Sequence, residues 1–144
     1  MKTLIRNILQ TKSSTVHSIS PEASVLDALR QMEETNVGAL IVMDGGKLVG
    51  IVSERDYARK VILKGRTSSD TSVNDIMSTK VICATPDQTV EECMAVMTAK
   101  AVRHLPVLDQ KAVVGIVSIG DLVKAIIGEQ QFMIEQLENY IHGH

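Results

Sequence analysis

The sequence predicts an α/β (α+β) fold made of two β-α-β-β-α repeats packed pseudo-twofold and followed by an extended C-terminal helix. Two observations support this prediction: a seven-residue motif that occurs twice, and a long register of matching residues around it. The motif reads GIVSERD from Gly50 to Asp56 and GIVSIGD from Gly115 to Asp121. Each copy contains a Gly, two β-branched residues, a Ser and, three places after the Ser, an Asp.

The register of matching residues extends far beyond the motif. Sliding the chain on itself by 115 − 50 = 65 positions aligns 16–62 with 81–127 without a gap, so that Val16 falls on Val81 and Pro21 on Pro86. Self-similarity at a constant offset indicates a tandem duplication. The predicted organisation is repeat 1 over 1–64, a polar linker over 65–71, repeat 2 over 72–128 and a helical extension over 129–144.

Each repeat is expected to contain the same five elements in the same order. A short strand ends before a Pro, which stops ladder pairing, and the helix that follows carries apolar residues at i, i+4 and i+7. Two β-branched runs joined by a turn then form a hairpin, and a second helix begins at the motif Ser. The predicted strands are 16–19, 39–43 and 48–52 in the first repeat, and 81–84, 104–108 and 112–117 in the second.

The two repeats are predicted to form one cooperative unit, because neither copy alone can cover both faces of a three-stranded sheet. The last helix should run from Ile119 to near Tyr140, which is longer than the pair needs for itself. This excess length predicts a packing surface for a second subunit. A solvated tail helix is the alternative.

Composition limits the classes of partner. The chain has 144 residues, 44% of them hydrophobic and 2% aromatic, with a net charge of −2. This charge gives no electrostatic basis for nucleic acid or an anionic membrane as the main partner. No apolar run is long enough for a membrane span or a signal peptide. The two cysteines form no CxxC motif, so no metal site is expected. We therefore expect an aliphatic core and a cytoplasmic location.

The repeated Ser-x-x-Asp has a purely structural interpretation. A Ser at the N-cap with an acidic residue three places later forms a capping box, which satisfies free backbone N–H groups at a helix start. The chain has the same spacing at Ser24, Ser72 and Thr89. Spacing alone therefore favours capping for both motifs.

The position of the motif adds a functional interpretation. In both copies the Ser follows a buried strand and starts a helix, where free N–H groups favour an anion. An Asp in the first turn can accept two hydrogen bonds from a vicinal diol, such as the two ribose hydroxyls of a nucleoside. A pocket between strands 39–43 and 104–108 would then take the base. The predicted ribose-binding residues are Ser53, Asp56, Ser118 and Asp121.

The double motif, in this order of elements, resembles the CBS domain family, whose tandem pairs are called Bateman modules. The segments Asn36–Leu40 and Arg103–Val107 strengthen the resemblance to small stand-alone CBS pairs. Members of the family are regulatory modules without catalysis of their own. The resemblance implies an adenosine-containing ligand (AMP, ADP, ATP, NAD or S-adenosylmethionine) in clefts between the repeats.

The resemblance also implies roles for further residues. Phosphates are expected to meet Arg103 and His104, in a cleft with Asp56 that should prefer the more phosphorylated ligand. The matching positions of the first repeat, Gly38 and Ala39, carry no charge. Arg55 is a further phosphate candidate, with a merely solvated side chain as its alternative. Base contacts are expected from Ser20, Thr85, Ala39 and Pro106.

The sequence thus favours a nucleotide-sensing homodimer that signals to an effector protein it does not identify. Two other classes remain as alternatives. In a purely structural or protein-interaction scaffold, both motifs would be helix caps only. An enzyme is disfavoured, because no His is placed within either copy to activate a motif Ser as a nucleophile, and no catalytic residue is predicted.

Overall fold

The computed structural model describes residues 2–12 and 15–142 and divides into two compact units. One unit consists of residues 15–82 and is called here the Asp56 unit. The other consists of residues 1–14 and 83–144 and is called the Asp121 unit. These units differ from the sequence repeats, because each takes the segment that precedes the other repeat's first strand.

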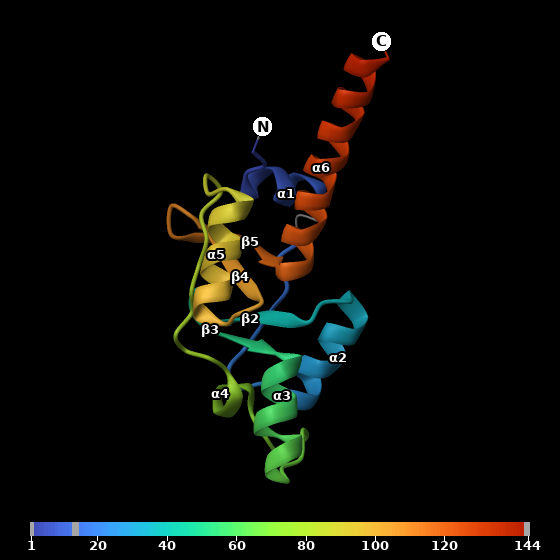
Figure 1. The fold of residues 1–144 in the computed structure, drawn as a ribbon. Coiled ribbons are helices and arrows are strands. Elements are labelled where there is room, and N and C mark those ends of the chain that lie inside the picture. The colour runs from blue at the N-terminus through green and yellow to red at the C-terminus, as the bar shows by residue number, and fades with distance from the viewer. Residues whose placement is uncertain (1, 13–14, 143–144) are drawn as a thin grey trace. The chain divides into compact units, whose positions relative to one another are not determined.

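The Asp56 unit contains a three-stranded sheet in the order β1-β2-β3. β1 pairs parallel to β2, and β2 pairs antiparallel to β3 with a bulge between Val42 and Met43. The helices and the 3₁₀ turn account for the rest of the regular structure (Figure 1). The elements are β1 (Ser18–Ile19), α2 (Val25–Thr35), β2 (Ala39–Asp44), β3 (Lys47–Ser53), α3 (Glu54–Lys60), η1 (Ile62–Lys64) and α4 (Val73–Ile76).

The Asp121 unit contains a two-stranded antiparallel sheet, β4-β5, with its bulge between Val107 and Leu108. The long last helix predicted from the sequence is present, and the bounds of the two hairpin strands agree with the predicted runs to within one residue. The elements are α1 (Ile5–Thr11), α5 (Val90–Lys100), β4 (His104–Asp109), β5 (Ala112–Ser118) and α6 (Ile119–Ile141).

The strand predicted over 81–84 is wrong. Only Ala84 pairs, as a single parallel bridge to Val107. The Ala84 N–H donates to the Pro106 carbonyl at 2.8 Å, and the Ala84 carbonyl accepts from the Leu108 N–H at 2.9 Å. The next residue already belongs to a turn, since the Thr85 N–H donates to the side chain of Gln88. The pairing does not extend toward Val81, because Pro106 has no N–H to donate, whereas Ile41 at the equivalent position of the first repeat donates to the His17 carbonyl at 3.3 Å. β1 is shortened to two residues of the predicted four.

Aliphatic side chains form the core, as the scarcity of aromatic residues predicts. In the Asp56 unit, α2 lays Val25, Ala28 and Met32 against alternate residues of β2. β2 is buried along Ala39–Val42, which identifies it as the central strand of its sheet. Strands that are buried on both faces have continuous apolar sequences, and Ala39–Val42 has such a sequence.

The motif glycines mark the places where a leading segment crosses a strand. In the Asp56 unit, Ser78 exchanges two backbone hydrogen bonds with Ile51 at 2.9 and 3.0 Å. A Cβ atom on Gly50 would lie 2.7 Å from the Met77 sulfur and 3.0 Å from the Ser78 carbonyl. In the Asp121 unit, a Cβ on Gly115 would lie 2.6 Å from a Leu9 methyl. The motif begins with Gly in both copies because a second segment packs directly on the strand.

The second half of α6 extends beyond the rest of its unit (Figure 1). Leu122, in its first turn, is fully buried, whereas large apolar residues from Phe132 to Ile141 are exposed. Among the residues that the structure describes, no helix combines the length and the apolar character that a membrane span requires.

The two glycines give a test of this packing. We expect Gly50→Ala to lower the free energy of unfolding by about 1–3 kcal/mol, the usual cost of overpacking, because the Ser78 backbone cannot move away from the new methyl. Gly115→Ala should cost less, about 1 kcal/mol or below, because it meets only the flexible end of Leu9. Urea denaturation of both variants measures the difference, and equal losses would contradict this explanation of the motif.

Candidate functional site

Both motifs form complete capping boxes, as the structural interpretation predicts. The Ser53 N–H donates to Asp56 Oδ2 at 2.9 Å, and the Asp56 N–H donates back to Ser53 Oγ at 3.3 Å. The corresponding bonds between Ser118 and Asp121 measure 2.8 and 3.1 Å. Each box begins a helix, α3 or α6, immediately after a strand, so the carboxylate is held at the junction of strand and helix.

Asp56 also pairs with a lysine of its own helix. Lys60 Nζ lies 3.2 Å from Asp56 Oδ1 and donates to the carbonyl of Ile76 at 2.8 Å. The Asp56 side chain is 17% exposed. Its two oxygens therefore have separate partners: Oδ2 accepts from the cap and Oδ1 faces the lysine.

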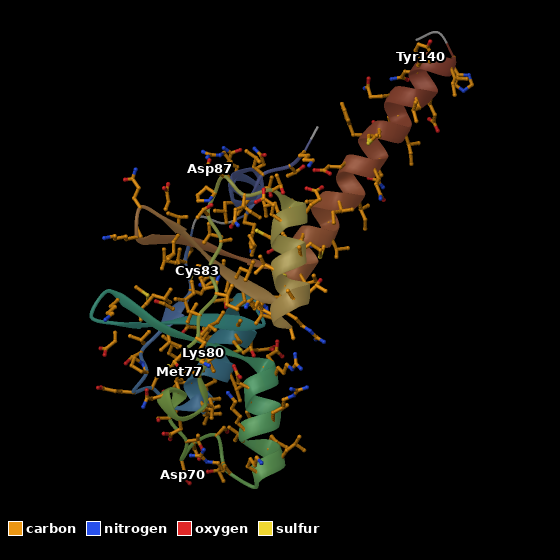
Figure 2. The ribbon with its side chains drawn as sticks, turned by 60° about the vertical axis from the view of Figure 1, so that its left-hand side comes forward. Asp70, Met77, Lys80, Cys83, Asp87 and Tyr140 are labelled. Carbon is orange, nitrogen blue, oxygen red and sulfur yellow. The ribbon has the colours of Figure 1, made fainter. Side chains whose placement is uncertain are left out.

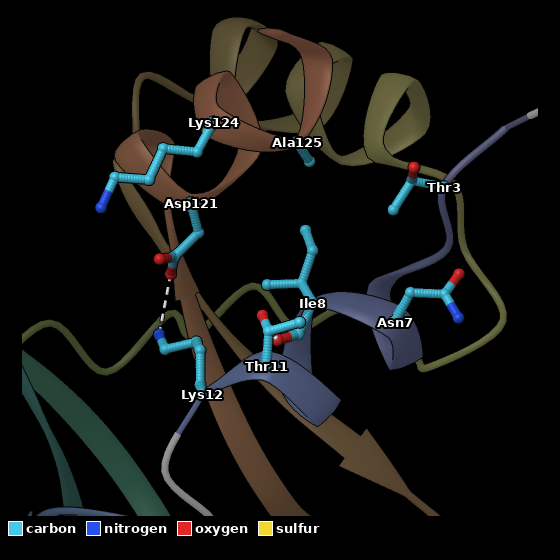
Figure 3. Close-up of a pocket in the computed structure, with 8 residues that line it drawn as sticks. All are labelled: Thr3, Asn7, Ile8, Thr11, Lys12, Asp121, Lys124 and Ala125. Atoms are coloured by element: carbon cyan, nitrogen blue, oxygen red, sulfur yellow. Dashed lines mark hydrogen bonds and ion pairs between the residues drawn. The ribbon is translucent and has the colours of Figure 1, made fainter. Parts of the chain in front are cut away.

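Asp121 pairs with a lysine from a distant part of the chain. Lys12, which directly follows α1, donates from Nζ to Asp121 Oδ2 and to the Ile116 carbonyl, each at 2.8 Å (Figure 3). The Asp121 side chain is 19% exposed and the Lys12 side chain 34%. The cap and the lysine use the same oxygen, and the ion pair ties the end of α1 to the first turn of α6.

The pKa of Asp121 reflects these partners. Burial opposes ionisation, but the hydrogen bonds from Lys12 and from the Ser118 N–H, together with the lysine charge, bring the pKa below its ordinary value of 3.8. The carboxylate is therefore ionised at neutral pH and remains a hydrogen-bond acceptor.

A cavity of about 310 Å³ lies beside Asp121 within the same unit. Figure 3 shows Lys12, Asp121 and Lys124 at one end, Thr3 and Asn7 at the other, and Ile8 between them. The cavity thus has an apolar middle and polar ends, as small-molecule sites commonly do. Its lining comes from α1 and its flanking residues and from the first turns of α6.

The predicted phosphate residues Arg103 and His104 also belong to the Asp121 unit. His104 pairs with Ser118 in the β4-β5 ladder, and the Ile119 N–H donates to the Arg103 carbonyl at 2.9 Å. In the Asp56 unit the equivalent positions are Gly38 and Ala39, which contact the first motif in the same way. The combination of Arg103 with Asp56 stays a prediction.

The remaining predicted residues are divided between the units. Arg55 is exposed on α3. Ala39 and Pro106 are buried in β2 and β4, but at different places: Ala39 is equivalent to His104, and Pro106 lies two residues further along its strand. Ser20 and Thr85 are exposed in the turns before α2 and α5. Their predicted contacts with a base stay predictions.

Lys12 is the residue that the sequence analysis missed. A signal was present: Ile8-Leu9-Gln10-Thr11-Lys12 is repeated as Ile76-Met77-Ser78-Thr79-Lys80. The Thr-Lys pair is thus part of the duplication, at an offset of 80 − 12 = 68 positions. Lys80 is exposed, and Figure 2 places it in the segment after Met77.

Comparison with known proteins decides the family. The sequence model of the CBS domain matches residues 5–63 and 73–128, most of the chain. The chain belongs to the CBS domain family. The membership predicted from the double motif is thereby confirmed.

Relatives of this CBS-domain chain include proteins of similar size. It is 39% identical over 150 residues to the mitochondrial CBS domain-containing protein CBSX3 of Arabidopsis thaliana, covering 98% of this chain and 73% of the relative. A solved protein with CBS domains from Burkholderia ambifaria MC40-6 superposes with a TM-score of 0.86 at 46% identity, covering 89% of this chain and 96% of that one.

A third CBS relative was solved with ligands. The CBS domain pair of protein MJ0100 superposes with a TM-score of 0.80 at 28% identity, covering 90% of this chain and 99% of that one. Its structure is a complex with 5′-methylthioadenosine and S-adenosyl-L-methionine. Within the described ranges of this CBS-domain chain, no group of three or more His, Cys, Asp or Glu side chains could hold a metal ion.

His104 makes the stability of the Asp121 unit depend on pH. Burial lowers its pKa below the ordinary 6.5, the charge of Asp121 opposes this, and the charges of Lys12 and Arg103 add to it. The folded state then binds fewer protons than the unfolded state, so stability is complete above about pH 6.5 and is lost as the pH falls below it.

Lowering the pH from 7.5 to 5.5 should therefore reduce the melting temperature of His104→Gln less than that of the parent protein. His17→Gln, in the other unit, controls for the loss of an imidazole. Thermal melts followed by circular dichroism measure both. An unchanged pH dependence in His104→Gln would contradict the assignment.

Proposed function

We propose that this CBS pair is a regulatory module that binds an adenosine-containing nucleotide (AMP, ADP, ATP or NAD) through its motif aspartates and signals occupancy to an effector protein. The observation that carries the proposal is the ionised Asp121 beside a cavity of about 310 Å³. The complex of the MJ0100 pair with two adenosine compounds supports this ligand class.

Capping and ligand binding are compatible uses of one carboxylate. A carboxylate offers about four lone-pair directions. In both motifs the cap bonds to Oδ2 and leaves Oδ1 outside the cap. The capping box holds the side chain in a single orientation before a ligand arrives. A ribose diol could then bind without the cost of ordering that side chain.

Regulation follows from linkage. A ligand that binds only the folded chain stabilises it, and one that fits two conformations unequally shifts their populations. Binding alone is enough for this function, and the proposal includes no catalytic step.

The scaffold alternative also has an observation in its favour, since both motif aspartates already have partners in their own units. In that case the motifs would only begin helices, and no nucleotide would bind. A direct binding measurement separates the two functions.

We expect AMP, ATP or NAD at millimolar concentration to raise the melting temperature of the parent protein. Asp121→Asn should weaken binding about tenfold or more, because hydrogen bonds to a charged acceptor are worth about 1.5–3 kcal/mol. Isothermal titration calorimetry measures this loss.

Asp75→Asn is the matched control for this experiment. Asp75 belongs to a capping box with Ser72 and pairs with Arg66, but it lies outside both motifs. Its variant should bind as the parent does. A melting temperature unchanged by every nucleotide would support the scaffold, and equal losses in Asp121→Asn and Asp75→Asn would assign the effect to stability.

We also propose that the free half of α6 pairs with the same helix of a second copy. Its apolar side chains follow a spacing of three and four residues, which places them on one face. Their exposed fractions run from 54% for Ile134 to 86% for Tyr140. The members of this α6 stripe are Met133, Ile134, Leu137, Tyr140 and Ile141.

A second copy suits the stripe because a twofold interface buries the same surface on both chains. Gln130 continues the stripe toward the folded unit, where it provides one polar position. A single polar residue in such a seam is known to set the register of paired helices. No Lys or Arg lies between residues 129 and 142, so nothing in this part of α6 attracts an acidic partner.

We expect Leu137→Glu to convert the dimer to a monomer at micromolar concentrations, because it places a charge in the stripe. Gln136→Glu adds the same charge one residue away, off the stripe, and should remain dimeric. Sedimentation equilibrium measures both. A parent protein that stays monomeric over the whole concentration range would contradict self-association and leave the α6 stripe for an effector.

A further inference from the structure

We propose that Lys12 is an exchangeable clamp on the Asp121 motif. It holds the carboxylate in the free protein and moves to the phosphate of a bound nucleotide, so that this motif selects phosphorylated adenosine ligands. This inference rests on the proposed function, and it specifies the chemistry of the ligand and the residue that recognises it.

The geometry allows Lys12 to exchange partners. Its ammonium donates two hydrogen bonds, to Asp121 Oδ2 and to the Ile116 carbonyl, out of the three that it can make. The side chain is one-third exposed at the mouth of the cavity. A lysine is a compact charge on a flexible stem, so it can turn to a new anion without a change of backbone.

A neutral nucleoside competes poorly with this arrangement. Asp121 Oδ2 already accepts from the Ser118 N–H and from Lys12. A ribose diol that bonds to both carboxylate oxygens must share Oδ2 with these donors, and if it displaces Lys12 the ammonium loses the Asp121 carboxylate. Nothing on the nucleoside replaces that partner.

The phosphate of a phosphorylated ligand can replace the Asp121 carboxylate as the partner of Lys12. A phosphate can take the ammonium in a charge-assisted hydrogen bond, which leaves Asp121 free for the ribose. Lys124 lines the same cavity one turn along α6, and Arg103 directly precedes β4, where His104 pairs with Ser118. The positive charges of Lys12, Lys124 and Arg103 in this unit favour an anionic ligand over a neutral one.

The Asp56 motif lacks this arrangement. Its lysine, Lys60, comes from the same helix and faces Oδ1, whereas the cap uses Oδ2. Lys60 also donates to the Ile76 carbonyl, so its release would loosen a link between α3 and the end of α4 inside the Asp56 unit. Release of Lys12 breaks the two hydrogen bonds that it makes from the end of α1 to β5 and α6. Lys12 also lies three positions before Thr15, the first residue of the Asp56 unit.

The test is calorimetric titration of the full chain with adenosine and, separately, with AMP. We expect the parent to bind AMP about tenfold more tightly than adenosine or better. Lys12→Met should lose that preference, because AMP binding weakens while adenosine binding stays equal or improves. Lys60→Met is the matched control and should keep the preference.

Lys12→Arg provides a second variant in case Lys12→Met is poorly folded. It keeps the charge and should keep a preference for AMP. Binding of both ligands with the same preference in the parent and in Lys12→Met would overturn the clamp alone. Equal weakening of both ligands would also overturn it and would assign Lys12 a structural role. If neither ligand binds the parent, the proposed function fails, and the clamp fails with it.

Discussion

The reciprocal hydrogen bonds between the motif Ser and Asp are the constraint on which the site depends. They begin α3 and α6 at the ends of β3 and β5, and they hold each carboxylate in one orientation. Without the cap, the Asp side chain would be free to rotate, and a lysine or a ligand would have to order it first. The same bonds therefore serve stability and, under the proposed function, binding.

The second constraint is the close packing of a leading segment on each motif glycine. α1 and the residues after α4 cross β5 and β3 where a side chain would collide with them. This packing takes residues 1–14 into the unit of the second repeat, and residues 72–82 into the unit of the first. The crossing makes the compact units differ from the sequence repeats. It also brings Lys12 to Asp121, although 109 positions separate them.

The duplication has left two similar frameworks with different charges. Both motifs have a cap and a lysine, but Lys60 is local and Lys12 is remote. The second motif also has Arg103 and His104 where the first has Gly38 and Ala39. The hairpins and caps of the two units are alike, and the difference in charge around them is what the proposed clamp at Asp121 rests on.

The sequence by itself determined the duplication, the hairpins, the capping boxes and the family, because these depend on local patterns repeated at a constant offset. Its prediction of a strand over 81–84 failed because Pro106 has no N–H to donate at the position where Ile41 donates in the first repeat. Only the tertiary structure decided which unit α1 joins and which cation faces Asp121. A lysine can pair with any carboxylate that the fold brings near, and residue spacing does not report distances across 109 positions of chain.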